Sequence, residues 1–194
     1  MNIEDYLKKH VKKYVVFDLD STLAQLKIDW SGFRKGVWET VASFDEPLTK
    51  KVPFEPWKHI ELVTKAVKRH GKLAKKALDA FNEQYELSHY SGYIPNTPLL
   101  DIIRCNNQYV YFIWTSNSAK TIQPFLEKEK LSPYFKDIIT RERVGLIKPA
   151  PDGFRFIYNP KTDKKEYVLV GENFTDEGAA RAAGIDFFLI DYFT

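Results

Sequence analysis

The stretch VVFDLDSTL, residues 15–23, decides the fold of this chain. It begins with a continuous apolar run and ends abruptly in Asp18-Leu19-Asp20. An unbroken apolar run, rather than an alternating one, is typical of a strand buried on both faces of a parallel sheet. We therefore expect residues 14–17 to form a buried strand, with Asp18 and Asp20 just beyond its carboxyl end.

Several other stretches of the chain resemble this first one. Three are equally apolar and a fourth is fainter, at residues 109–114, 167–170, 187–190 and 138–140. Helical patterns separate them, among them residues 119–130 and residues 176–183, which end before Gly184 in a position typical of a helix stop. Strands that alternate with helices predict an α/β fold, a Rossmann-like parallel sheet in a three-layer core with helices on both faces.

One long interval breaks this alternation. Residues 26–90 are far more than a single crossover helix needs, and their apolar residues recur with helical spacing in three stripes. Proline residues lie between the first two stripes. We predict a Rossmann-like catalytic core from residues 1–25 and 91–194, with an α-helical cap inserted at residues 26–90.

Composition limits the classes of function. The chain has 194 residues, 44% of them hydrophobic, which suits one domain with an insertion. A net charge of +3 spread over a mixed surface does not call for nucleic acid, and we expect none as a partner. Cys105 is the single cysteine, and no apolar run approaches the ~18 residues of a membrane span. We expect a cytoplasmic protein without a membrane partner, either a monomer or a homodimer.

Polar side chains follow the predicted strands at the points where these end. In open α/β sheets this edge binds ligands. Converging carboxylates repel one another unless a hard cation such as Mg²⁺ lies between them, while hydroxyls, backbone amides and a lysine are the donors that a phosphate needs. The candidate residues for a phosphoryl-transfer site are Asp18, Asp20, Thr115, Ser116, Asn117, Lys148, Glu172 and Asp176.

Four motifs together resemble the haloacid dehalogenase-like hydrolases, in the phosphoglycolate-phosphatase-like branch with a helical cap. VVFDLDSTL resembles the first motif, Asp-x-Asp-x-Thr after a strand, and FIWTSNS resembles the second, a strand ending in Thr or Ser. GLIKPAPDGF is similar to the third motif and VLVGENFTDEGAARAAG to the fourth. All four occur in the family's order, and YIPNTPLLDII resembles the segment that returns from the cap.

The resemblance implies a magnesium-dependent phosphatase that forms an aspartyl-phosphate. Asp18 would attack phosphorus, and Asp20 would protonate the leaving oxygen and later activate water. Thr115, with Ser116 and Asn117 beside it, and Lys148 would bind the phosphoryl oxygens. Magnesium ligands would be Asp18, the backbone carbonyl of Asp20, and the acids Glu172 and Asp176. The implied substrate is a small phosphorylated metabolite.

Two positions depart from the family pattern. Ser21 stands where glycine is commonest, and Glu172 stands where aspartate is usual, so either Glu172 or Asp176 can be the direct metal ligand. Asp176 could also act only as the cap of its helix. The four histidines, among them His59, lack metal-ligand spacing, and we assign none of them to the site.

Two further functions remain open at this stage. A sugar phosphomutase would share the whole core and return the phosphoryl group to its product. A binding or regulatory module would keep the fold after its metal site had decayed, and Glu172 is the feature that supports it. A haloalkanoate dehalogenase is disfavoured, because it needs no second acid at Asp20 and no metal.

Overall fold

The computed structural model describes residues 2–191 and residue 193. The elements in chain order, with 3-10 helices written η, are α1 (Ile3–Lys9), β1 (Tyr14–Phe17), β2 (Ala24–Leu26), α2 (Trp30–Thr49), α3 (Lys58–His70), α4 (Lys72–His89), β3 (Tyr93–Pro95), α5 (Thr97–Cys105), β4 (Val110–Trp114), α6 (Ala119–Lys128), η1 (Ser132–Tyr134), β5 (Phe135–Ile139), η2 (Arg141–Arg143), η3 (Pro151–Gly153), α7 (Phe154–Ile157), η4 (Lys164–Glu166), β6 (Tyr167–Gly171), α8 (Phe174–Ala183) and β7 (Asp186–Leu189).

The first predicted strand, β1, lies at the centre of a five-stranded sheet with the order β5-β4-β1-β6-β7. Its neighbours run parallel to it, so that Val15 is paired with Tyr111 on one side and with Val168 on the other. The chain winds outward from β1 to β5 and then returns to β6, which reverses the direction of winding beside β1. Ligands bind at such a reversal, outside the carboxyl ends of the strands.

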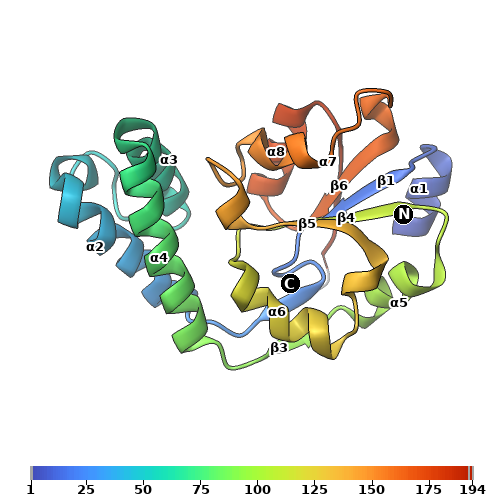
Figure 1. Ribbon diagram of the computed structural model, residues 1–194, viewed down its shortest axis with the longest axis horizontal. Helices are drawn as coiled ribbons and strands as arrows, with labels where there is room; N and C mark the ends of the chain where they lie inside the picture. Colours follow the sequence, from blue (N-terminus) through green and yellow to red (C-terminus); the bar gives the residue numbers. More distant parts are fainter. Residues whose placement is uncertain (1, 192, 194) are drawn as a thin grey trace.

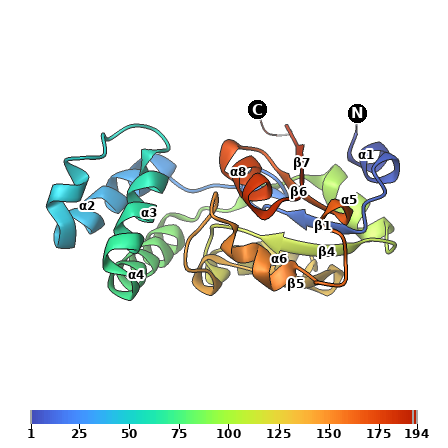
Figure 2. The ribbon, with the colours of Figure 1, turned by 90° about the horizontal axis from the view of Figure 1, so that it is seen from above.

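Both faces of the sheet are covered by helices (Figures 1 and 2). Val15 and Phe17 point into a core shared with α1, α5 and α6, whereas Tyr14 and Val16 point into a second core shared with α7 and α8. All four residues of β1 are consequently buried, which accounts for its continuous apolar run. The predicted α/β fold with a parallel sheet is confirmed.

The edge strand β5 differs most from its prediction. It spans Phe135–Ile139 and begins before the predicted residue 138, because Lys136 and Asp137 belong to the strand although they are not buried. An edge strand tolerates polar residues of this kind, which hide it from a search for apolar runs. The short elements α1, β2 and β3 were not predicted.

Helices α2, α3 and α4 form a group beside the sheet, which we term the three-helix unit (Figure 1). They share their own apolar core, which includes Val37, Val41, Leu62 and Leu78. Helices α2 and α4 approach closely at Gly36, where an added Cβ would lie 2.1 Å from the Phe81 ring. The chain enters and leaves this unit through β2 and β3, which pair as an antiparallel ribbon.

The helix α2 is kinked near its end. Asp45 has φ −151° and ψ 65°, outside the helical range, two residues before Pro47. The buried Asp45 carboxylate accepts hydrogen bonds from Arg69 at 3.1 Å and lies 2.7 Å from His70 Nε2. These contacts tie the kink of α2 to the last turn of α3.

Across residues 2–191 and residue 193, the search for a helix with the length and apolar character of a bilayer span finds no candidate.

Candidate active site

A buried lysine joins the first and fourth sequence motifs. Lys148 Nζ lies 2.5 Å from Asp18 Oδ1 and 2.5 Å from Asp176 Oδ1. Asp18 extends the sheet beyond β1, because its backbone N–H donates to Val170 at 2.9 Å. The three charged side chains are 1–8% exposed, so one cation and two carboxylates share an interior position. Residues 130 positions apart in the chain therefore meet at one edge of the sheet.

The end of β6 places Asp176 beside this lysine. Asn173, rather than Asp176, caps helix α8, since its side-chain oxygen accepts from the Thr175 N–H at 2.8 Å. The Asp176 carboxylate is left to face Lys148, and its second oxygen accepts from the Glu172 N–H at 3.3 Å. Gly171 allows this approach, because a Cβ there would lie 2.5 Å from Asp176 Oδ2.

The turn after β1 positions Asp20. Its carboxylate accepts from the Leu26 N–H at 2.8 Å, which anchors it against β2. Ser21, between the two elements, has φ +62°. This left-handed conformation suits glycine better than any other residue, which gives a physical reason for the glycine common at this position in the family.

The loop after β4 is held by its own side chains and by α4. Thr115 Oγ1 donates to Asn117 Oδ1 at 2.8 Å and accepts from the Asn117 N–H at 3.1 Å. Glu86 of α4, which is fully buried, accepts from the Ser118 N–H at 3.1 Å and from the Thr121 hydroxyl at 2.7 Å. The three-helix unit is thus hydrogen-bonded to the start of α6.

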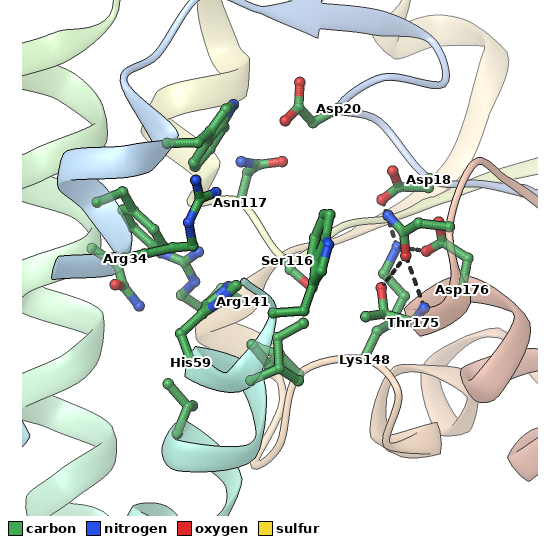
Figure 3. A pocket seen from close by; sticks show the side chains of 18 of the residues that line it. Asp18, Asp20, Arg34, His59, Ser116, Asn117, Arg141, Lys148, Thr175 and Asp176 are labelled. Atoms are coloured by element: carbon green, nitrogen blue, oxygen red, sulfur yellow. Dashed lines mark hydrogen bonds and ion pairs between the residues drawn. The ribbon is translucent and has the colours of Figure 1, made fainter. Parts of the chain in front are cut away.

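A cavity of about 350 Å³ lies between the sheet edge and the three-helix unit (Figure 3). Seven of the eight predicted residues line it, namely Asp18, Asp20, Ser116, Asn117, Lys148, Glu172 and Asp176. Thr115 is not among the lining residues and is 2% exposed. The structure therefore brings the predicted residues to one place from four separate segments of the chain.

Burial changes the acidity of both aspartates of the first motif. Burial raises the pKa of Asp20 to about 8, although the hydrogen bond from Leu26 opposes the change. Burial, together with the charge of Asp176, raises the pKa of Asp18 to about 7, while Lys148 acts in the opposite direction. Burial alone would lower the pKa of Lys148, but the charges of Asp176 and Asp18 raise it. Asp20 is consequently protonated at neutral pH.

The donor set suits a hard cation. Asp18, Asp20, Glu172 and Asp176 supply only oxygen atoms. Even with Asp20 protonated, the other three acids can carry more negative charge than the single positive charge of Lys148 balances. Mg²⁺ takes one or two carboxylates and keeps several water ligands, and a backbone carbonyl can complete the set.

Other cavity residues were not found from the sequence. Arg34, Asn82 and Arg141 line the cavity, and so does His59, to which we assigned no role. They come from α2, α4, η2 and α3 and meet only through tertiary packing. No local spacing in the sequence could have marked them.

The comparisons with known proteins agree with this geometry. The sequence profile of the haloacid dehalogenase-like hydrolases matches residues 15–190, so the chain belongs to that family of hydrolases. A curated relative is phosphoglycolate phosphatase 1 of Pseudomonas aeruginosa, 26% identical over 94% of this chain and 70% of that protein.

Solved structures show the same fold at low sequence identity. A protein from Lactobacillus plantarum with a provisional phosphoglycolate phosphatase assignment has a TM-score of 0.59 and 19% identity, covering 91% of this chain and 84% of that one. CbbY from Rhodobacter sphaeroides, in complex with phosphate, has a TM-score of 0.56 and 17% identity, covering 94% and 87%. The family profile confirms the predicted superfamily and the hydrolase class, and the Pseudomonas relative agrees with the predicted phosphoglycolate-phosphatase-like branch.

Proposed function

We propose that the protein is a magnesium-dependent phosphatase that hydrolyses a small-molecule phosphate monoester through a phosphorylated Asp18. The observation that carries the proposal is the contact between Asp18 and Lys148 within a cavity that Asp20 also lines. A carboxylate nucleophile, a cation and a protonated acid are the groups that phosphoryl transfer needs.

In the first step, a carboxylate oxygen of Asp18 attacks phosphorus and the bond from phosphorus to the ester oxygen breaks. Asp20 gives its proton to that leaving oxygen, and its pKa of about 8 keeps it protonated at neutral pH for this purpose. Lys148 balances charge on the phosphoryl oxygens, and Ser116 and Asn117 offer hydrogen bonds from the opposite loop.

In the second step, Asp20 is a carboxylate and takes a proton from water. The water oxygen attacks phosphorus, the bond to Asp18 breaks, and inorganic phosphate leaves. The atoms balance, because Asp20 regains the proton that it gave up in the first step. The surrounding three-helix unit limits the access of other water while the phosphorylated Asp18 exists.

Magnesium, when bound, supplies positive charge that lets an anionic nucleophile approach an anionic ester. We propose that Asp18, Asp176 and the backbone carbonyl of Asp20 hold it. Asp176 is favoured over Glu172 as a direct ligand, because Asp176 is fully buried and contacts the same Lys148 Nζ as Asp18, whereas Glu172 is only part-buried.

The cavity supports a small substrate. Its volume of about 350 Å³ and its enclosure by α2, α3 and α4 leave room for a metabolite rather than a folded protein or duplex nucleic acid. The name of the Pseudomonas relative supports a phosphate ester of this size as the substrate class. The three-helix unit would act as the cap that selects it.

Hydrolysis of p-nitrophenyl phosphate tests the proposal. We expect turnover by the wild-type protein with Mg²⁺, none with a chelator, and loss of at least a hundredfold in Asp18→Asn. Asp101→Asn is the matched control, because Asp101 is an exposed acid on α5, and it should behave as wild type. Rapid acid quenching should trap phosphate on the wild-type protein and not on Asp18→Asn. Activity in Asp18→Asn equal to that of the control would contradict the proposed nucleophile.

A further inference from the structure

A buried glutamate of the three-helix unit lies beside the loop that follows β4. Glu86 is in the last turn of α4 and is fully buried. Its carboxylate accepts hydrogen bonds from the core, across the boundary of the three-helix unit. A carboxylate without access to water is costly unless charges and hydrogen-bond donors compensate it. The proposed phosphatase chemistry does not use Glu86, so its contacts need a separate explanation.

One oxygen of Glu86 completes the cap of α6. Ser118 is the N-cap residue of this helix, and its hydroxyl oxygen accepts from the Thr121 N–H at 3.2 Å. In a capping box, a glutamate three residues after the N-cap accepts from the N-cap N–H. That position is Thr121 here, and the first turn of α6 contains no acidic residue. Glu86 Oε2 takes the place of that acid from another helix, because it accepts from the Ser118 N–H at 3.1 Å and from the Thr121 hydroxyl at 2.7 Å.

The other oxygen of Glu86 holds Arg141 on the opposite side of the loop. Arg141 Nη2 lies 2.8 Å from Glu86 Oε1, and both side chains are buried. The backbone N–H of Arg141 donates to the Asn117 carbonyl at 3.2 Å. Lys75, also on α4, donates to the Arg141 carbonyl at 3.1 Å. The carboxylate of Glu86 therefore contacts both residues that flank Asn117: Ser118, which follows it in the chain, and Arg141, which is hydrogen-bonded to it.

These contacts bear on the orientation of Asn117, which lines the cavity (Figure 3). Its Oδ1 accepts from the Thr115 hydroxyl at 2.8 Å, so Nδ2 is the side-chain atom that can donate to a phosphoryl oxygen. A change in the backbone at residues 117 and 118 would move this amide. Hydrogen bonds weaken steeply away from their best geometry, and a misplacement of about 1 Å can cost about a hundredfold in rate.

A structural role alone would also account for a capped helix. Glu83, about one turn earlier on α4, shows such a tie, because it pairs with Lys120 of α6 at 2.7 Å. Both side chains of that pair are well exposed or half-buried, and such pairs contribute little to stability. Glu86 differs from Glu83, because it is fully buried and its contacts converge on both sides of one cavity residue.

We propose that Glu86 is a positioning residue, through which the three-helix unit sets the place of the Asn117 amide in the phosphoryl-binding loop. The inference rests on the proposed phosphatase function and adds to it a residue outside the four motifs. Glu86 acts through Ser118 and Arg141 and does not itself contact the reacting groups. The chemistry of the core therefore depends on the last turn of α4 even for a substrate without specific contacts to the three-helix unit.

Glu86→Gln in the full chain, assayed with Mg²⁺ and p-nitrophenyl phosphate, tests the inference. Glutamine keeps the volume, and its carbonyl oxygen can accept from Ser118 and Thr121. Its NH2 group then faces the Arg141 guanidinium, which is also a donor, so the contact to Arg141 is lost. We expect kcat/KM to fall at least tenfold. Glu83→Gln is the matched control on the same helix and should remain within twofold of wild type.

Two ligand measurements show whether the loss lies at the loop. The inhibition constant of inorganic phosphate should rise at least threefold in Glu86→Gln, because phosphate binds to the same loop as the substrate. The Mg²⁺ concentration for half-maximal activity should stay at the wild-type value, because Glu86 contacts the loop rather than the proposed metal ligands. Equal losses in phosphate and Mg²⁺ binding would refute the inference, because the whole site would then be disturbed.

A double-variant cycle with Asn117→Ala separates positioning from general damage. If Glu86 acts through Asn117, Glu86→Gln should cost at least tenfold in kcat/KM in the wild-type background but less than threefold in Asn117→Ala. Equal costs in the two backgrounds would refute the inference. Far-ultraviolet circular dichroism checks that each protein is folded at the assay temperature.

A second variant keeps the test open if Glu86→Gln does not fold. Thr121→Val has nearly the same shape and removes one donor to Glu86 while leaving the ion pair with Arg141. We expect it to lose about threefold in kcat/KM, and to lose nothing further in Asn117→Ala. The same loss in both backgrounds would refute the inference.

The outcomes separate this inference from the proposed function. If the wild-type protein does not hydrolyse p-nitrophenyl phosphate, the phosphatase proposal fails and the inference fails with it. If the wild-type protein is active and folded Glu86→Gln equals the Glu83→Gln control, only the positioning role of Glu86 is refuted.

Discussion

Replacing Lys148 by methionine would test the charge balance of the buried site directly. Methionine keeps much of the side-chain volume but removes the ammonium, which leaves Asp18 and Asp176 buried without it. The Lys148 and Asp176 side chains are 2% and 1% exposed, and that of Asp18 is 8% exposed. Removing one partner of a buried ion pair in this way costs about 3–5 kcal/mol. We expect the free energy of unfolding to fall by that amount at pH 7.

Lys12→Met supplies the matched comparison. Lys12 is also buried, with 2% exposure, and its Nζ lies 2.5 Å from Asp186. The Asp186 side chain is 45% exposed, however, so water can solvate this carboxylate after the lysine is removed. We therefore expect a smaller loss for Lys12→Met, about 1–2 kcal/mol.

Guanidinium unfolding followed by far-ultraviolet circular dichroism, with a chelator present to remove metal, measures both losses. Adding Asp18→Asn to Lys148→Met should recover part of the lost free energy of unfolding, because one of the two buried carboxylates that have lost their lysine partner is removed. A difference of less than 1 kcal/mol between Lys148→Met and Lys12→Met, or no recovery in the double variant, would refute the reasoning.

Three further predictions follow from other parts of the structure. Burial, with the nearby charges of Arg34 and Arg141, lowers the pKa of His59 to about 4, whereas a histidine in the unfolded chain has a pKa near 6.5. The unfolded chain binds the extra proton between these values, so the contribution of His59 to stability should fall by about 2 kcal/mol from pH 8 to pH 5, against the opposite contributions of the raised Asp18 and Asp20 pKa values. The stability of His59→Phe relative to wild type should therefore rise by about 2 kcal/mol over the same range in unfolding experiments, and a constant difference would contradict the assignment. The hydrogen bond to His70 lowers the pKa of Asp45. The Asp45 carboxylate should therefore stabilise the fold fully above the unfolded pKa of about 3.9, and this stabilisation should be lost as the pH falls through the lower folded value. Asp45→Asn should thus be less stable than wild type at pH 7, by a margin that shrinks at pH 3. An equal margin at both values would show that the charge of Asp45 is not involved. Gly171→Ala places a Cβ 2.5 Å from Asp176 Oδ2, and overpacking of this kind costs about 1–3 kcal/mol. Both the unfolding midpoint and the turnover of p-nitrophenyl phosphate should therefore fall. Wild-type values for both would contradict the close approach of Gly171 to Asp176.

The sheet could be predicted because its central strands are buried on both faces. Residues 14–17 and 167–170 are continuously apolar for that reason, and the observed β1 and β6 agree with the prediction closely. The edge strand β5 contains Lys136, and the three-residue strands β2 and β3 are too short for a periodic pattern. Local pattern is thus informative only where the environment is uniform along the element.

The two ends of the cavity also differ in how well the sequence predicts their residues. Asp18, Asp20 and Asp176 follow strands of one sheet, so the rule for strand ends placed them together. Lys148 was placed there by the Pro-x-Pro motif beside it and by the order of the motifs. The Arg34 and Asn82 side chains meet Arg141 only because α2 and α4 pack beside the sheet at a particular angle. That angle depends on close contacts such as the one at Gly36, which no single-sequence pattern encodes.

The buried carboxylate Glu86 has a consequence for how such enzymes can be altered. It lies near the end of α4, yet its contacts are with Arg141, Ser118 and Thr121, all beyond the three-helix unit. The last turns of α4 are therefore bonded through Glu86 to residues on the sheet side of the molecule. A chimaera that exchanges the unit for a relative's should keep the segment from residue 83 onward and replace only what precedes it. Joining the chains after residue 90 would instead leave Arg141 facing a foreign helix.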